Sequence, residues 1–204
     1  MDMFDDLEEE NDTNEVKTTV YFDLETKRAA SEVGWENIDL MHMSLGCLYF
    51  EPENKYRFYT EDKVDELIGE LFKAHRVVGY NLIGFDYEVL RYYTDKDFSK
   101  LNTVDMMLDI NDCLGHKRSK NLDNVASATL GIGKTADGLK ALEWWDRYEK
   151  TGDEKYLRFI AKYCKGDVKV TKDVYHYGLV NGYIYYEKNG GKKTLIDNIR
   201  WTVR

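Results

Sequence analysis

The sequence predicts an α/β domain in which helices flank a mixed central sheet. Three β-type runs follow one another near the start of the chain, which predicts an antiparallel three-stranded meander. Over residues 55–110, strand and helix patterns alternate, as they do where crossover helices join parallel strands. The runs Tyr183–Lys188 and Lys192–Ile196 enclose an Asn-Gly-Gly turn, which predicts a β-hairpin near the end of the chain.

The meander is predicted from three runs of apolar and aromatic residues. These runs are Lys17–Asp23, Met41–Phe50 and Lys55–Thr60. A polar insertion over Lys27–Asn37 separates the first run from the second. Pro52, the single proline of the chain, lies in the turn between the second and third runs, where a proline costs least.

The middle of the chain supplies the alternating elements. Asp62–His75 is predicted as an amphipathic helix, because apolar residues recur in it at helical spacing. A short strand over Arg76–Tyr80, a loop over Asn81–Gly84 and a helix over Phe85–Tyr93 are expected to follow. Thr103–Ile110 is predicted as the next strand.

The last third of the chain is predicted to be mostly helical before the hairpin. Helices are expected over Asn121–Leu130, Gly138–Tyr148 and Asp153–Val180. The last of these is expected in two pieces that meet near Gly166, because glycine weakens a helix interior. All these elements fit one domain over residues 17–204, without an internal repeat.

Residues 1–16 are acidic, contain no Lys or Arg, and are predicted to form a disordered tail. The tail either keeps the protein soluble or docks a separate protein partner, such as one that acts in replication or repair. Because the net charge of −9 arises mainly in the tail, it argues only weakly against a nucleic-acid partner. Basic clusters at residues 116–120 and 188–204 would meet phosphates or remain solvated.

Composition argues against a membrane or secreted protein. No apolar run approaches the length of a membrane span, and the N-terminus lacks the basic and apolar regions of a signal peptide. The three cysteines match no metal-binding or redox spacing. We therefore expect a cytoplasmic protein with reduced, buried thiols, and we expect it to be a monomer.

Five residues are candidates for chemistry, although each also has an ordinary structural interpretation. Asp23 and Glu25 share one face of a strand, where a divalent cation would relieve their repulsion; the alternative is a solvated acidic strand end. Asp86 lies in the first turn of a helix, where the helix dipole favours an acid, so it could simply cap that helix. Tyr163 and Asp167 share a helix face, as an ordinary exposed pair also would.

Taken together, these residues resemble the motifs of the DEDD exonuclease family, which has a ribonuclease-H-like fold. The motifs are Phe22–Thr26, Gly79–Asp86 and Tyr163–Asp167, in the order that the family has them. In the branch that uses histidine, that residue stands five positions before the last aspartate. Lys162 occupies this position here, so the resemblance is to the tyrosine branch.

Within that branch, the chain is most similar to predicted exonucleases with a YprB-like domain. This narrower resemblance depends on Thr103–Asp105, on Leu130–Lys134 and on the closing hairpin that ends near Trp201. The resemblance covers about residues 18–202. It implies the ribonuclease-H-like fold for the predicted α/β domain.

The resemblance also implies hydrolysis with two divalent metal ions, about 3.5–4 Å apart. Oxygen ligands suit Mg²⁺ or Mn²⁺. Asp23 would bridge both metals, Glu25 and Asp167 would complete the site of the attacking water, and Asp86 would complete the site that faces the leaving 3′ oxygen. Tyr163 would orient the water, because an unperturbed tyrosine titrates near ~10 and is a poor base at neutral pH.

Four further residues are candidates for contact with the substrate. Thr26 belongs to the first motif, and Asn81 and Phe85 belong to the second, which would place them near the terminal nucleotide. Phe85 could instead belong to the hydrophobic core. Lys134 would meet a phosphate or remain a solvated loop lysine. Asp105, at the start of a predicted strand, is expected to be structural.

The sequence therefore predicts a metal-dependent 3′–5′ exonuclease that releases nucleoside monophosphates from DNA or RNA. One alternative is a nuclease-like module that binds nucleic acid or another protein and has little activity. Another is a proofreading or processing partner of a separate polymerase or helicase.

Overall fold

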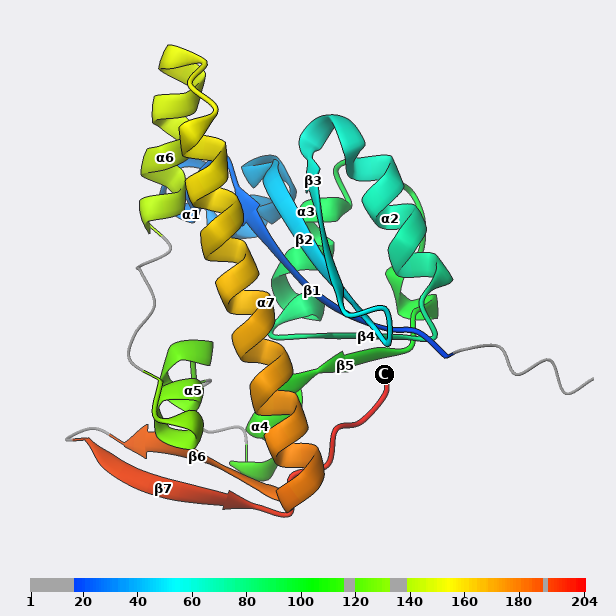
Figure 1. Cartoon of the computed structure of the whole chain (residues 1–204), viewed down its shortest axis with the longest axis vertical. Coiled ribbons are helices and arrows are strands. Elements are labelled where there is room, and N and C mark those ends of the chain that lie inside the picture. Colours follow the sequence, from blue (N-terminus) through cyan, green and yellow to red (C-terminus); the bar gives the residue numbers. More distant parts are fainter. Residues whose placement is uncertain (1–16, 116–119, 133–138, 189–190) are drawn as a thin grey trace, which may run out of the picture.

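The computed structural model describes residues 17–115, 120–132, 139–188 and 191–204 (Figure 1). In these residues the main sheet has five strands, in the order β3-β2-β1-β4-β5. The β1–β2 and β2–β3 pairs are antiparallel, and the β1–β4 and β4–β5 pairs are parallel. The strands are β1 Thr19–Thr26, β2 Met43–Glu51, β3 Lys55–Thr60, β4 Arg76–Gly79 and β5 Thr103–Asp105. The predicted mixed sheet, with its antiparallel meander, is confirmed.

Seven α-helices surround this sheet in the described part of the chain. They are α1 Ala30–Val33, α2 Val64–Lys73, α3 Tyr87–Leu90, α4 Met106–Cys113, α5 Leu122–Leu130, α6 Leu139–Thr151 and α7 Lys155–Asn181. The predicted polar insertion contains α1 and the start of a 3-10 segment, Trp35–Met41. None of the described helices is both long and apolar enough to cross a membrane.

Two hydrophobic layers form on the two faces of the sheet. One layer joins the sheet to α7, which crosses it diagonally (Figure 1), and includes Tyr21 of β1 and Ile160 of α7. The other layer joins the sheet to α2 and α3 and includes Phe22 and Leu24 of β1. Side chains alternate between the faces of a strand, so residues 23 and 25 lie on the α7 face.

The first and fifth strands differ in length from their predictions. β1 continues to Thr26, so Asp23 and Glu25 lie inside the strand rather than at its end. The predicted strand Thr103–Ile110 is wrong beyond Asp105, where α4 begins. The Asp105 carboxylate accepts a hydrogen bond from the backbone N–H of Met107 at 3.1 Å. This N-cap starts a helix inside an apolar run that resembles a strand.

The second motif also differs from its prediction. The expected loop Asn81–Gly84 and helix start at Phe85 are replaced by a π-helical turn over Leu82–Asp86, which runs directly into α3. Asn81 has a left-handed backbone, with φ of 67°. Asp86 therefore ends the turn instead of opening a new helix.

The predicted break near Gly166 is wrong, because α7 is one continuous helix of 27 residues. One stripe of this helix is buried along its length, from Ile160 through Cys164 and Val168 to Val174. Burial of such a stripe stabilises the helix by more than one glycine weakens it. As a result, Tyr163 and Asp167 are held on one rigid element.

The predicted hairpin is confirmed as β6 Tyr183–Lys188 paired with β7 Lys192–Asp197. It lies beside α5 at the end of the molecule far from α6 (Figure 1). Side chains of α5 bind the β6 backbone. Asn124 accepts from the Glu187 N–H at 2.9 Å, and Thr129 accepts from the Tyr185 N–H at 3.0 Å. Hydrogen bonds from α5 thus hold the hairpin against the domain.

Three expectations concern residues that the structure does not describe, namely residues 1–16, residues 116–119 of the first basic cluster, and Lys134. The expectation for the cysteines is partly wrong. Cys47 and Cys164 are buried free thiols, whereas Cys113, near the end of α4, is exposed.

Candidate active site

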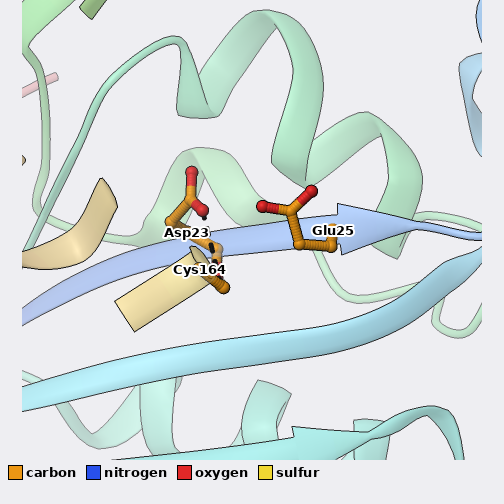
Figure 2. Close-up of side chains that lie close together, drawn as sticks. All are labelled: Asp23, Glu25 and Cys164. Carbon is orange, nitrogen blue, oxygen red and sulfur yellow. Dashed lines mark hydrogen bonds between the residues drawn. The ribbon is translucent and has the colours of Figure 1, made fainter. Parts of the chain in front are cut away.

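Four carboxylates converge from three separate elements. Asp23 and Glu25 project from β1 to the same side, next to Cys164 of α7 (Figure 2). Asp86 comes from the π-helical turn, where it is only 3% exposed and accepts the Leu24 N–H at 3.1 Å. Asp167 comes from α7. The charges of Asp167 and Asp86 both act on Glu25, which places all four acids in one electrostatic cluster.

Burial and the charge of a neighbouring acid raise the pKa of every carboxylate in this cluster. Burial is the largest cause for each of the four. The charge of Asp167 further raises the pKa of Asp23, and the charge of Asp23 raises the pKa values of Glu25 and Asp86. Among the described residues, no Lys or Arg contributes to these shifts. In the described part of the chain, the cluster is therefore a partly buried concentration of acids without a compensating side-chain cation.

Tyr163 belongs to the same cluster. Burial raises its pKa far above the usual range, and the charges of Asp167, Glu25 and Asp23 raise it further. The tyrosine remains a phenol at neutral pH and can donate a hydrogen bond. Such a bond to Asp167 offsets part of the rise in the pKa of that acid, which burial and then the charge of Asp123 bring to about 7.

Asp105 has a structural role, as expected from the sequence, because it binds the backbone of the second motif. Its carboxylate is fully buried and accepts the backbone N–H groups of Asn81 at 2.9 Å and Ile83 at 3.0 Å. These bonds fix the left-handed Asn81 and the turn that carries Asp86. The sequence did not predict that Asp105 would bind the backbone of this particular turn.

The residues predicted to contact the substrate differ in burial and in the groups that they contact. Asn81 and Phe85 are half-buried, and Phe85 packs against the hydrophobic layer of α2 and α3. Thr26 is nearly buried, and its hydroxyl donates to the Arg28 carbonyl at 2.9 Å. Lys134 lies outside the described residues. Substrate contact by these four residues stays a prediction.

Two residues of the cluster were not predicted. The Cys164 thiol donates to the Asp23 carbonyl at 3.3 Å and to Asp23 Oδ2 at 3.4 Å, and this hydrogen bond lowers the pKa of the Asp23 carboxyl. One ligand atom each from Asp23, Glu25 and Cys164 lie within 4.8 Å of one another. Asp123, near the start of α5, raises the pKa of both Asp167 and Tyr163. For Cys164 the only signal was its place next to Tyr163, and Asp123 gave none.

A protein-family model described as the RNase_H superfamily matches residues 20–178, which include all four carboxylates and Tyr163. The chain belongs to the RNase H superfamily. Membership supports a nuclease-type function on nucleic acid, and RNase H-like nucleases generally use divalent metals.

Comparison with solved structures agrees with this RNase H-like fold. The chain superposes on the family B DNA polymerase from the hyperthermophilic archaeon Pyrobaculum calidifontis with a TM-score of 0.58 and 18% sequence identity. The match covers 79% of this chain and 24% of the polymerase chain, so it spans about a quarter of that protein's length. At this identity the likeness concerns the fold. No curated protein matches the chain by sequence.

Proposed function

We propose that this RNase H-like domain is a metal-dependent 3′–5′ exonuclease of the tyrosine DEDD type, related to the YprB-like exonucleases. Its products would be nucleoside monophosphates from DNA or RNA. The observation that supports this most is the convergence of Asp23, Glu25, Asp86 and Asp167. Each acid alone has an ordinary structural interpretation, but a cluster of one buried and three half-buried acids, with no side-chain cation among the described residues, does not.

The residues present fit a pair of divalent cations. The four carboxylates offer only oxygen ligands, which suit Mg²⁺ or Mn²⁺. Burial first and repulsion between like charges second raise their pKa values, and bound cations would offset both effects. When bound, such ions stabilise the developing charge and lower the pKa of a water molecule.

The chain itself would supply position and shape. The Leu24 N–H holds Asp86 against β1, and the Cys164 thiol holds Asp23. Tyr163, which stays protonated, would orient the attacking water rather than act as a base. Thr26, Asn81 and Phe85 would contact the terminal nucleotide. Lys134 would bind a phosphate.

The test uses end-labelled single-stranded DNA, duplex DNA and RNA with Mn²⁺ or Mg²⁺. We expect shortening from the 3′ end with release of mononucleotides, and loss of this activity on chelation. Asp23→Ala should lower the rate by about 10³-fold or more, because it removes several kcal/mol of stabilisation. Asp146→Ala, which changes an exposed acid of α6, should retain the wild-type rate. Activity that survives Asp23→Ala would overturn the proposal.

Calorimetric titration with Mn²⁺ separates the exonuclease from the inactive alternative. The exonuclease requires Mn²⁺ binding that Asp23→Ala weakens, whereas an inactive module would release no heat. A separate polymerase or helicase partner would be sought by pull-down with and without residues 1–16. Equal recovery of the partner would show that residues 1–16 are not needed for that interaction.

A further inference from the structure

An aromatic surface adjoins the carboxylate cluster on its α6 side. It consists of Trp144, Phe159 and Tyr163, which we call the aromatic platform. The ring centroids of Trp144 and Phe159 are 5.6 Å apart, and those of Trp144 and Tyr163 are 6.5 Å apart. Because the charges of Asp167, Glu25 and Asp23 act on Tyr163, the platform adjoins the proposed catalytic centre.

The platform is open to solvent although its residues are large and aromatic. Phe159 is 44% exposed, and Trp144 and Tyr163 are half-buried. α6 and the first half of α7 run side by side past the edge of the sheet (Figure 1). A further ring, that of Tyr156, lies 6.2 Å from Phe159 and extends the surface along α7. Adjacent exposed rings of this kind are typical of a binding surface.

Cationic side chains flank the platform. Lys140 and Arg147 are four residues before and three residues after Trp144, which places them on the same side of α6. On α7, Lys162 is exposed and lies one turn from Phe159. In the residues that the structure describes, no carboxylate pairs with Lys140 or Lys162, whereas Asp146 on α6 is paired with Lys150. The charges beside the rings therefore suit a phosphate backbone.

We propose that the aromatic platform binds unpaired bases of the nucleic-acid strand whose 3′ end enters the carboxylate cluster. This inference rests on the proposed function and gives it a substrate class, single-stranded nucleic acid. Aromatic rings stack on bases of any sequence, and neighbouring cations follow the backbone. Paired bases inside a duplex cannot offer their faces to rings, so a duplex end has to fray before it can occupy the platform.

The test measures binding in the presence of a chelator, so that cleavage plays no part. Fluorescence anisotropy would follow 5′-labelled oligothymidylate and oligouridylate, which separate DNA from RNA. Trp144→Ala and Phe159→Ala are each expected to weaken binding by about tenfold, which corresponds to about 1.4 kcal/mol of lost stacking. Trp144→Phe keeps a ring and should bind nearly as tightly as the wild type.

Phe58→Ala is the matched control for Phe159→Ala. Phe58 is 41% exposed but lies on the edge strand β3 and does not belong to the aromatic platform. This variant should bind as the wild type does. A strand with 2-aminopurine next to its 3′ end reports stacking directly, because stacking quenches its fluorescence. Quenching is expected with the wild type and with Phe58→Ala, and it should decrease in Phe159→Ala.

Thermal melting of each variant separates lost binding from lost folding, and Phe159 is exposed enough for its alanine variant to fold. Wild-type binding and quenching in folded Phe159→Ala and Trp144→Ala would overturn the platform, even if nucleotides are released normally. Conversely, normal platform binding without metal-dependent release would overturn the exonuclease and leave a single-strand binding module. The two proposals therefore fail separately.

Discussion

Asp86 and Asp105 are both buried aspartates, but their surroundings differ in the number of hydrogen bonds. Asp105 accepts three backbone N–H groups, those of Asn81, Ile83 and Met107. Asp86 accepts the N–H of Leu24, and burial followed by the charge of Asp23 raises its pKa. A carboxylate with several backbone donors is satisfied by the protein. Asp86, which lies among like charges, is the aspartate that a cation would stabilise.

Asp167 should make the stability of the metal-free protein depend on pH. Burial, followed by the charge of Asp123, raises its pKa from an ordinary value of 3.8 to about 7. Between these values the folded state holds a proton that the unfolded chain has released. The stabilisation from this group is therefore complete at low pH and is lost as the pH rises through about 7. Urea denaturation in a chelator, from about pH 5 to about pH 8, should show the midpoint falling.

Asp167→Asn provides the control, because an amide does not titrate. Its denaturation midpoint should change less over the same range. Mn²⁺ should raise the midpoint of the wild type most at about pH 8, where the carboxylates are ionised, and should raise that of Asp167→Asn less. If the denaturation midpoint of Asp167→Asn depended on pH as that of the wild type does, the pH dependence would arise from other acids.

At the level of elements, the sequence predicts most where one pattern dominates. The meander, the helix that became α2 and the β-hairpin were predicted because spacing and turn residues agree there. Residues 103–105 form the predicted strand, but residues 106–110 were assigned wrongly because their apolar run has no helical signal. What ends β5 is a hydrogen bond from Met107 to Asp105, two residues apart. The break at Gly166 was wrong because burial against the sheet, a tertiary effect, outweighs local propensity.

For the site, sequence spacing identified the acids that the fold brings together. It could do so because the motifs repeat a known order along the chain. Cys164 and Asp123 were missed because their influence on Asp23 and Asp167 depends only on proximity in space. The α6 ring of Trp144 likewise meets Tyr163 from a different helix. Contacts between elements distant in sequence have no local pattern.

Two glycines of α7 should respond in opposite ways to the same change. An added Cβ at Gly166 would meet no atom within 4 Å, so Gly166→Ala should raise the unfolding free energy by about 0.5–1 kcal/mol. An added Cβ at Gly178 would lie 2.6 Å from Cζ2 of Trp201, so Gly178→Ala should lower it by about 1–3 kcal/mol. Urea denaturation measures both changes. Destabilisation by Gly166→Ala would contradict a continuous helix there.

At the scale of the whole molecule, the last residues of the chain close the fold. The Trp201 ring stacks on Tyr175 of α7 and donates to its carbonyl at 2.8 Å. Val203 forms a bridge with Val104 of β5. Arg204 contacts Asp109 at 2.7 Å and Asp112 at 2.8 Å, both on α4. This arginine belongs to a basic cluster that the sequence allowed as a phosphate contact, but its two ion pairs make it a structural residue.

Arg204→Ala should destabilise the protein more than an exposed arginine would. Asp109 is only 3% exposed on its side chain, and burial already raises its pKa although Arg204 opposes the rise. Without the arginine a buried carboxylate loses its charged partner, at an expected cost of about 2–3 kcal/mol in unfolding free energy at neutral pH. The loss should shrink in acid, where Asp109 is protonated and needs no cation.

Arg200→Ala is the matched control, because Arg200 lies in the same segment and is exposed. Its unfolding free energy should stay within about 0.5 kcal/mol of the wild type. Asp109→Asn combined with Arg204→Ala should recover part of the loss, since the amide oxygen can still accept the Thr202 N–H that Asp109 accepts at 3.0 Å. If Arg204→Ala were as mild as Arg200→Ala at neutral pH, closure of the fold would depend on Trp201 and the Val203 bridge instead of the ion pairs.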